Sequence, residues 1–287
     1  MGAIFYISIS MQNTQKSRVL ITNDDGVNSA NIHALAGALA PFGEVFVFAP
    51  ETEQSGVSQA FTVRKGIRVQ KGSSGQYEVY SVSGTPADAA KFAIGCFAAH
   101  GFSADPAANE VPGSHFDVCF SGVNVGENSG VSSLYSGTVA GAREAALWGV
   151  PAVALSLCVG GESLMPAVLD FAVHVVRDRL YAQMPPNTFW NVNFPKSKDG
   201  TFKGVRATKM ALGMFTDHYD RLEGVSGLDG VWQLDGEKLW EKEPVDSDDY
   251  VLHQGYATLT PHRIDQTDVE SLNRISEMIE GGCLMSF

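Results

Sequence analysis

Short apolar segments alternate with segments of helical character over the first two thirds of this chain. Residues 18–22 and 44–50 read as buried strands, and the helix-like segment between them ends near Pro41 and Gly43. The same alternation continues through the apolar segments at 77–84, 116–122, 150–157 and 189–195. Because parallel strands need crossover helices, this order predicts an α/β fold with a doubly wound, mainly parallel sheet.

The alternation of strands and helices stops after residue 195, and this change marks an expected boundary in the chain. Residues 196–262 carry many charges and scattered aromatic side chains, which favours β-hairpins and loops appended to the sheet as an arm. A short helix is predicted at 268–281. We therefore expect an N-terminal extension (1–17), an α/β core (18–195), and a β-arm with a C-terminal helix (196–287), all within one structural unit.

Charge and cysteine content exclude several function classes. With 20 Lys and Arg against 32 Asp and Glu, the net charge of −12 argues against long nucleic acids or an anionic membrane as partners. No apolar run is long enough to span a bilayer. The four cysteines are widely spaced and form no CxxC pair, so we expect reduced thiols in a cytoplasmic protein.

Two adjacent acids, Asp24 and Asp25, follow the first predicted strand in the sequence NDDG. Adjacent carboxylates repel each other unless a proton or a cation is shared between them. Their oxygens are suitable ligands for Mg²⁺ or Mn²⁺. The alternative is a simple turn, in which Asp25 or Asn28 bends the chain and Gly26 permits the bend.

Two further loops are predicted at the same edge of the sheet. The glycine-rich loop SGVNVGENSG (121–130) brings Asn124 and Asn128, whose amides suit a metal or an anion, and its alternative is a flexible surface turn. Ser136, Gly137 and Thr138 begin a helix, where free N–H groups favour phosphate, although a capping role explains the hydroxyls as well. The sequence contains neither a P-loop nor a G-x-S-x-G motif.

Taken in order, these segments resemble the SurE family of survival-protein nucleotidases. The resemblance runs over residues 18–267 and is carried by VLITNDDG, VFAPETEQSGVSQAFT, VSGTPADAAKFAI, DVCFSGVNVGENSG, YSGTVAGAREAALWGVPAVALS, WNVNFP and GYATLTPHRIDQT. It implies a Rossmann-like core, one divalent metal cation, and a homodimer or homotetramer formed through the C-terminal arm. It also implies metal ligands at Asp24, Asp25, Ser55 and Asn124, and phosphate contacts at Asn128, Ser136, Gly137 and Thr138.

The resemblance implies a metal-dependent 5'-nucleotidase. Such an enzyme hydrolyses nucleoside 5'-monophosphates, and whether it also hydrolyses 3'-monophosphates stays open. The metal activates the attacking water, and Asp24 or Asp25 orients it. Two alternatives stay open: a phosphatase that forms an aspartyl-phosphate, and a non-catalytic Mg²⁺-binding signalling module. The loop at 98–115 is longer than the resemblance leads us to expect and could alter the rim of the site or an oligomer contact.

Overall fold

The structure is a computed structural model that describes residues 16–73, 75–101, 115–213, 215–224 and 227–281. Most of the predicted N-terminal extension and most of the long 98–115 loop lie outside the described residues. Across the residues that are described, no helix combines the length and the apolar character that crossing a bilayer would take.

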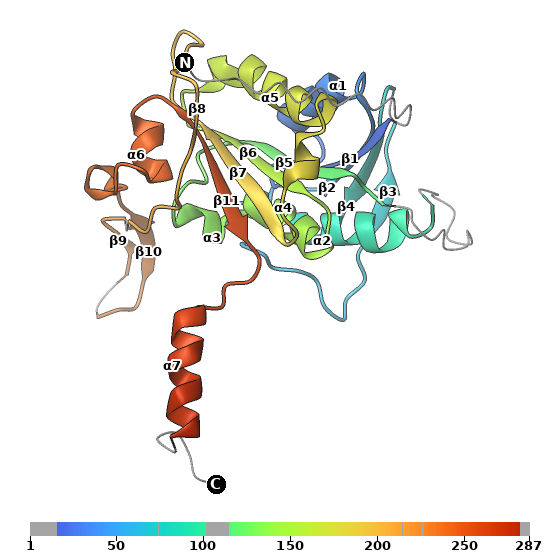
Figure 1. Cartoon of the computed structure of the whole chain (residues 1–287). Coiled ribbons are helices and arrows are strands. Elements are labelled where there is room, and N and C mark those ends of the chain that lie inside the picture. The colour runs from blue at the N-terminus through green and yellow to red at the C-terminus, as the bar shows by residue number, and fades with distance from the viewer. Residues whose placement is uncertain (1–15, 74, 102–114, 214, 225–226, 282–287) are drawn as a thin grey trace, which may run out of the picture.

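A central sheet organises the molecule (Figure 1). Within the described residues it has nine strands, in the order β3-β4-β2-β1-β5-β6-β7-β11-β8. The pairs from β4 through β7 are all parallel, whereas β3 and β11 each pair antiparallel with a neighbour. The bounds of the strands are β1 (Ser17–Thr22), β2 (Gly43–Pro50), β3 (Val69–Lys71), β4 (Glu78–Val82), β5 (Val118–Val125), β6 (Ala152–Leu157), β7 (Thr188–Phe194), β8 (Val205–Ala207) and β11 (Ala257–Arg263).

Helices cover both faces of the sheet, so the predicted doubly wound α/β fold is confirmed. On one face α1 (Ala30–Leu39) and α5 (Met165–Arg177) pack into a common core, and on the other α2 (Pro86–Phe92) and α4 (Gly137–Leu147) do so. Shorter helical elements connect them: η1, a π-helix (Ala93–Ala98), α3 (Ser132–Tyr135), and the 3-10 turns η2 (Glu162–Leu164) and η3 (Leu180–Gln183).

Strand β1 shows why the chain adopts this arrangement. Successive side chains of a strand point to opposite faces, and both faces of β1 are buried. Val19 and Ile21 join the core with α1 and α5, whereas Leu20 joins the core with α2 and α4. A strand that is apolar at consecutive positions therefore needs a helix layer on each side.

The segment after residue 195 divides between the sheet and a projecting arm. The arm, residues 215–224 and 227–242, consists of the hairpin β9 (His218–Glu223) and β10 (Val231–Asp235) and the 3-10 turn η4 (Trp240–Lys242). Strands β8 and β11, however, extend the central sheet, with β11 running antiparallel to β7. Part of the segment therefore belongs to the central sheet, because β11 pairs with the edge of β7 that β6 leaves free.

Two helices complete the C-terminal part. Helix α6 (Asp248–His253) lies between the arm and β11, and α7 (Val269–Glu280) stands away from the body of the molecule (Figure 1). The predicted C-terminal hairpin and terminal helix are therefore confirmed.

His262 in β11 makes the stability of the fold depend on pH. Its ring stacks on Phe189 of β7, with centroids 5.1 Å apart, and its Nε2 is buried without a hydrogen-bond partner among the described residues. Burial, assisted by the charge of Arg143, lowers the pKa of His262 from 6.5 to about 4. Between these values the unfolded chain binds a proton that the folded chain does not, so stability falls as the pH falls from 6.5 toward 4.

We predict that His262→Phe removes this component, because phenylalanine keeps the ring stack and cannot be protonated. The free energy of unfolding of the native protein should fall relative to that of the variant by up to about 1.4 kcal/mol per pH unit over this range. Urea unfolding at pH 7, 6 and 5 measures the difference. His218→Gln, which removes an exposed histidine of the arm, serves as the control, and parallel curves for the native protein and His262→Phe would contradict the assignment.

Candidate active site

The candidate site lies where the strand order reverses direction. Strand β1 is central, with β2 on one side and β5 on the other, and ligands of doubly wound sheets bind beyond the carboxyl ends of the strands at this point. The NDDG loop follows β1 and the SGVNVGENSG loop begins within β5.

Asn23 turns the chain in the NDDG loop, and sequence reasoning gave it no role. Its side-chain amide donates to the carbonyl of Gly26 (3.0 Å) and accepts from the Gly26 amide (3.2 Å), while Gly26 has a φ of +98°. Neither Asp25 nor Asn28 is needed to make this turn. Asp25 is therefore not needed for the turning role that the alternative gave to it or to Asn28.

Asp24 packs against the first turn of α4. Its side chain is 6% exposed, and its Oδ1 accepts a hydrogen bond from the Thr138 hydroxyl at 2.5 Å. Its carbonyl accepts from the amide of Gln54 at 2.7 Å, which brings in the loop that contains Ser55. A Cβ on Gly137 would lie 2.8 Å from the Asp24 Cβ and 3.1 Å from the Gln54 carbonyl oxygen, so only glycine permits this approach.

Both carboxyl groups of the pair resist ionisation. Burial raises the pKa of Asp24 above its ordinary value, although the hydrogen bond from Thr138 opposes this effect. Burial, followed by the charges of Asp24 and Glu53, raises the pKa of Asp25 to about 6. A divalent cation would reverse these shifts, because an opposite charge favours the ionised form. The hard oxygen donors of this pair fit Mg²⁺ or Mn²⁺.

Ser55 and Asn124 are oriented by contacts within their own loops. The Ser55 hydroxyl donates to Glu53 at 2.6 Å, which leaves its lone pairs available, and Ser55 is exposed. The Asn124 amide nitrogen donates to the Gly126 carbonyl at 2.8 Å, so its carbonyl oxygen is the atom that remains to bind a ligand. Neither residue contacts Asp24 or Asp25 through a recorded hydrogen bond, and their role as metal ligands stays a prediction.

Asn128 is held by residues that sequence reasoning did not single out. Its backbone amide donates to Asn193 (2.7 Å), its side-chain amide donates to Ser156 (2.9 Å), and its carbonyl accepts from Asn191 (2.8 Å). All three partners are fully buried polar residues of β6 and β7. The signal in the sequence was the pair of asparagines in WNVNFP, two residues apart and therefore on one face of a strand.

The start of α4 offers an anion site. Ser136 caps the helix by accepting from the Val139 amide at 3.1 Å, and the first turn carries no acidic side chain. The amides of Gly137 and Thr138 lie at the positive end of the helix dipole, beside Asp24. Ser136 thus has the capping role of the alternative reading, and this role is compatible with anion binding. The Thr138 hydroxyl, by contrast, is directed at Asp24.

The sequence matches the family described as survival protein SurE over residues 19–217. The chain belongs to the SurE family. A protein of Flavobacterium psychrophilum named 5'-nucleotidase SurE is 33% identical over 259 residues, which cover 88% of this chain and 93% of that protein. One of Thermosipho melanesiensis with the same name is 34% identical and covers 91% of this chain and 97% of that protein.

A solved structure supports the family assignment. The crystal structure of the SurE protein from Aquifex aeolicus has a TM-score of 0.73 and 26% sequence identity to this chain. The match covers 91% of this chain and 99% of the other. The SurE fold therefore extends through almost the whole described chain, including strands that follow the matched family segment.

We predict that Gly137→Ala disrupts the acid pair, because the new methyl group would overlap Asp24. Binding of Mn²⁺ should weaken by about tenfold or more, which corresponds to about 1.4 kcal/mol. Isothermal titration calorimetry with Mn²⁺ measures the change.

Gly37→Ala is the matched control, because it also lies in a helix and a Cβ there meets nothing within 4 Å. It should leave Mn²⁺ binding unchanged and stabilise the protein by about 0.5–1 kcal/mol. Equal Mn²⁺ affinity in Gly137→Ala and Gly37→Ala would show that the close contact between Gly137 and Asp24 is not required for metal binding.

Proposed function

We propose that this protein is a metal-dependent phosphomonoesterase that hydrolyses nucleoside 5'-monophosphates to nucleoside and phosphate. The observation that carries the proposal is the contact between Asp24 and the N-terminal turn of α4, which joins an acid pair to the positive end of a helix. Two relatives that bear the name 5'-nucleotidase SurE and align over about nine tenths of the chain support the substrate class.

One divalent cation, Mg²⁺ or Mn²⁺, completes the proposed site. Asp24, Asp25, Ser55 and Asn124 would hold it with carboxylate, hydroxyl and amide oxygens. When bound, such an ion neutralises charge on the phosphate and makes water a better nucleophile near neutral pH.

The chain's own groups would then bind the phosphate and direct the water. The amides of Gly137 and Thr138 and the Ser136 hydroxyl bind the phosphate oxygens and stabilise the charge that grows on them during attack, while Asn128 contacts the phosphate. Thr138 occupies Oδ1 of Asp24, so Asp25 is the carboxylate that remains to orient the attacking water and take its proton.

The proposal is tested by phosphate release from 5'- and 3'-nucleoside monophosphates and from p-nitrophenyl phosphate, with EDTA, Mg²⁺ or Mn²⁺. We expect release that depends on the metal and favours 5'-monophosphates. Asp25→Asn should lower kcat by about 100-fold or more while circular dichroism shows an intact fold, because an amide neither accepts the proton nor carries the charge.

Two outcomes would contradict this mechanism. Near-native turnover of Asp25→Asn with metal still bound would remove the role of Asp25. Radioactive phosphate that stays on the acid-quenched protein after brief exposure to labelled substrate would favour an aspartyl-phosphate over direct attack by water.

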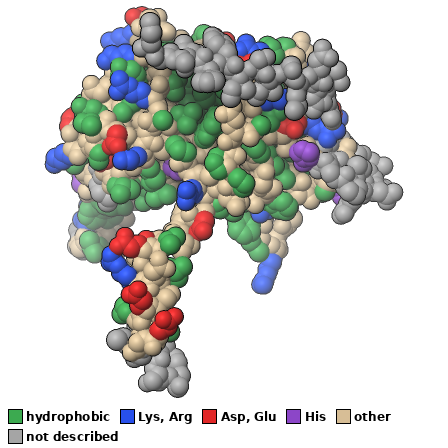
Figure 2. Space-filling view, viewed as in Figure 1, with side chains coloured by type: hydrophobic (Ala, Val, Ile, Leu, Met, Phe, Trp, Pro, Cys, Tyr) green, Lys and Arg blue, Asp and Glu red, His purple; other side chains and the backbone are tan. Residues whose placement is uncertain are grey.

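We also propose that the protein forms homo-oligomers, as a homodimer or homotetramer, through its C-terminal part. Helix α7 carries apolar side chains along one side, and these are about half exposed: Val269, Leu272, Ile275, Met278 and Ile279. Figure 2 shows hydrophobic side chains among the acidic side chains on the same projecting helix. An amphipathic helix without a core to pack on is stabilised by packing against a second copy.

Ile275→Glu should shift the oligomer toward the monomer, because it places a charge in the apolar side of α7. Light scattering coupled to size-exclusion chromatography measures the mass. Ser276→Glu adds the same charge at the neighbouring exposed position and should leave the mass unchanged. A native protein that is monomeric at all concentrations would contradict the proposal.

A further inference from the structure

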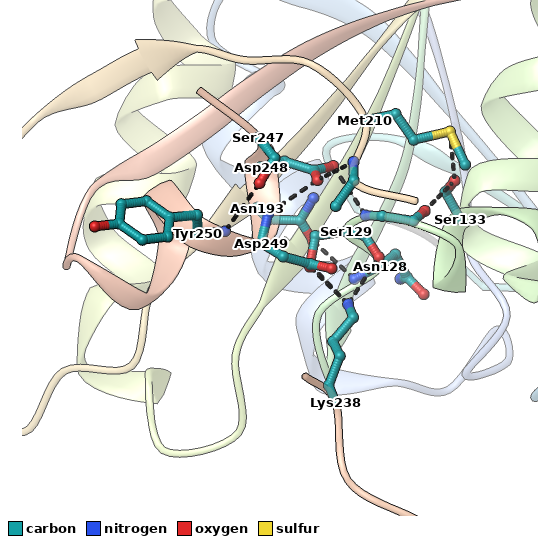
Figure 3. A network of polar contacts seen from close by, with 12 residues as sticks. Asn128, Ser129, Ser133, Asn193, Met210, Lys238, Ser247, Asp248, Asp249 and Tyr250 are labelled. Atoms are coloured by element: carbon teal, nitrogen blue, oxygen red, sulfur yellow. Dashed lines mark hydrogen bonds and ion pairs between the residues drawn. The ribbon is translucent and has the colours of Figure 1, made fainter. Parts of the chain in front are cut away.

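A second pair of adjacent acids, Asp248 and Asp249, contacts the loop that contains Asn128 (Figure 3). They begin α6, and both are buried, with 0% and 1% exposure. The Asn128 loop, residues 127–130, is therefore contacted both by this pair and by the asparagines of β7. The proposed mechanism assigns no role to either acid.

Each acid holds one residue of the loop. Asp248 accepts from the Gly130 amide at 2.9 Å and, through its other oxygen, from the Ala211 amide at 2.8 Å. Asp249 accepts from the Ser129 hydroxyl at 2.5 Å. Ser129 and Gly130 directly follow Asn128, so the two acids fix the part of the loop that the β7 asparagines do not reach.

The charge of Asp249 is balanced by Lys238 from the base of the arm. The Lys238 ammonium donates to Asp249 (2.6 Å) and to the carbonyl of Ser129 (2.9 Å), and the two charged side chains are 10% and 2% exposed. Lys238 follows strand β10 by three residues and pairs with Phe215 across the base of the arm. One ammonium group thus joins the arm, α6 and the Asn128 loop.

The position of the Asp249 carboxylate depends on the charge of Lys238. Its Oδ2 is buried with no hydrogen-bond partner among the described residues, and a Cβ on Gly130 would lie 2.5 Å from it. A buried carboxylate without a counter-charge is strongly unfavourable. Without Lys238, Asp249 would have to take up a proton or move toward solvent, and Ser129 would move with it.

We propose that Lys238 and Asp249 are positioning residues that hold the Asn128 loop in the geometry that receives the substrate phosphate. This inference rests on the proposed phosphatase function. It makes the base of the arm part of the phosphate site, although no arm residue needs to contact the substrate. The effect should fall on phosphate binding, because Asp24 and Asp25 lie on a different loop and Asn124 is held within β5 by its own contact with Gly126.

The test compares Lys238→Met with Lys242→Met, which removes an exposed lysine of the same segment. Lys238→Met should raise KM for a nucleoside monophosphate and Ki for inorganic phosphate by about tenfold or more, with kcat and Mn²⁺ affinity changed less than about threefold. Lys242→Met should change none of these quantities. Lys238→Met/Asp249→Asn should recover much of the loss, because asparagine still accepts from Ser129 and needs no counter-charge.

Hydrogen exchange gives a readout that does not depend on activity. Amides of the peptide that spans 127–130 should exchange at least about tenfold faster in Lys238→Met than in the native protein, and the double variant should reverse this change. Unchanged exchange, or a double variant as impaired as Lys238→Met, would overturn the inference. A native protein that releases no phosphate would instead overturn the proposed function, while the exchange experiment would still decide whether Lys238 holds the loop.

Discussion

The burial of like charges at the end of β1 is the constraint on which the site depends. Asp24 is almost completely enclosed, and its neighbour Asp25 adds a second carboxylate whose pKa is raised to about 6. The surrounding chain accommodates them with a hydroxyl donor at Thr138, a bare glycine at 137 and a turn made by Asn23. Burial disfavours the charged form of both carboxylates, as their raised pKa values show. The site is therefore kept at some cost to stability.

The two acid pairs of this chain show two ways of accommodating adjacent carboxylates. Asp248 accepts from two backbone amides, and a lysine from the arm balances the charge of Asp249, so both acids are held by groups of the chain itself. Asp24 and Asp25 have a hydroxyl donor, while Glu53 adds further negative charge nearby. Asp248 and Asp249 thus hold the chain's own backbone, whereas Asp24 and Asp25 are the pair that we propose binds a cation.

The sequence predicted the parts of the fold that depend on local pattern. Apolar strands and intervening helices identified the doubly wound sheet, and the rule that ligands bind at the carboxyl ends of strands brought the NDDG, SGVN and YSGT loops together. The partners of Asn128 could not be predicted, because Asn191, Asn193 and Ser156 reach it only through the register of β6 with β7. Lys238 is 109 residues from Ser129, and nothing local indicates that its charge is buried. Strand β11 was read as part of the appended region because alternation shows that a segment is a strand and not which sheet it joins.

The order of the strands also bears on how the chain acquires its site. Asp24 lies near the N-terminus, Asn128 near the middle and Asp249 near the C-terminus, so the loop has both sets of contacts only when β7 and α6 are in place. Contacts between such distant segments form late, since the entropy of closing long loops opposes them. During synthesis the ribosome must release most of the polypeptide before the Asn128 loop can close. While most of this protein is being synthesised, the part that has already folded therefore still lacks a complete site.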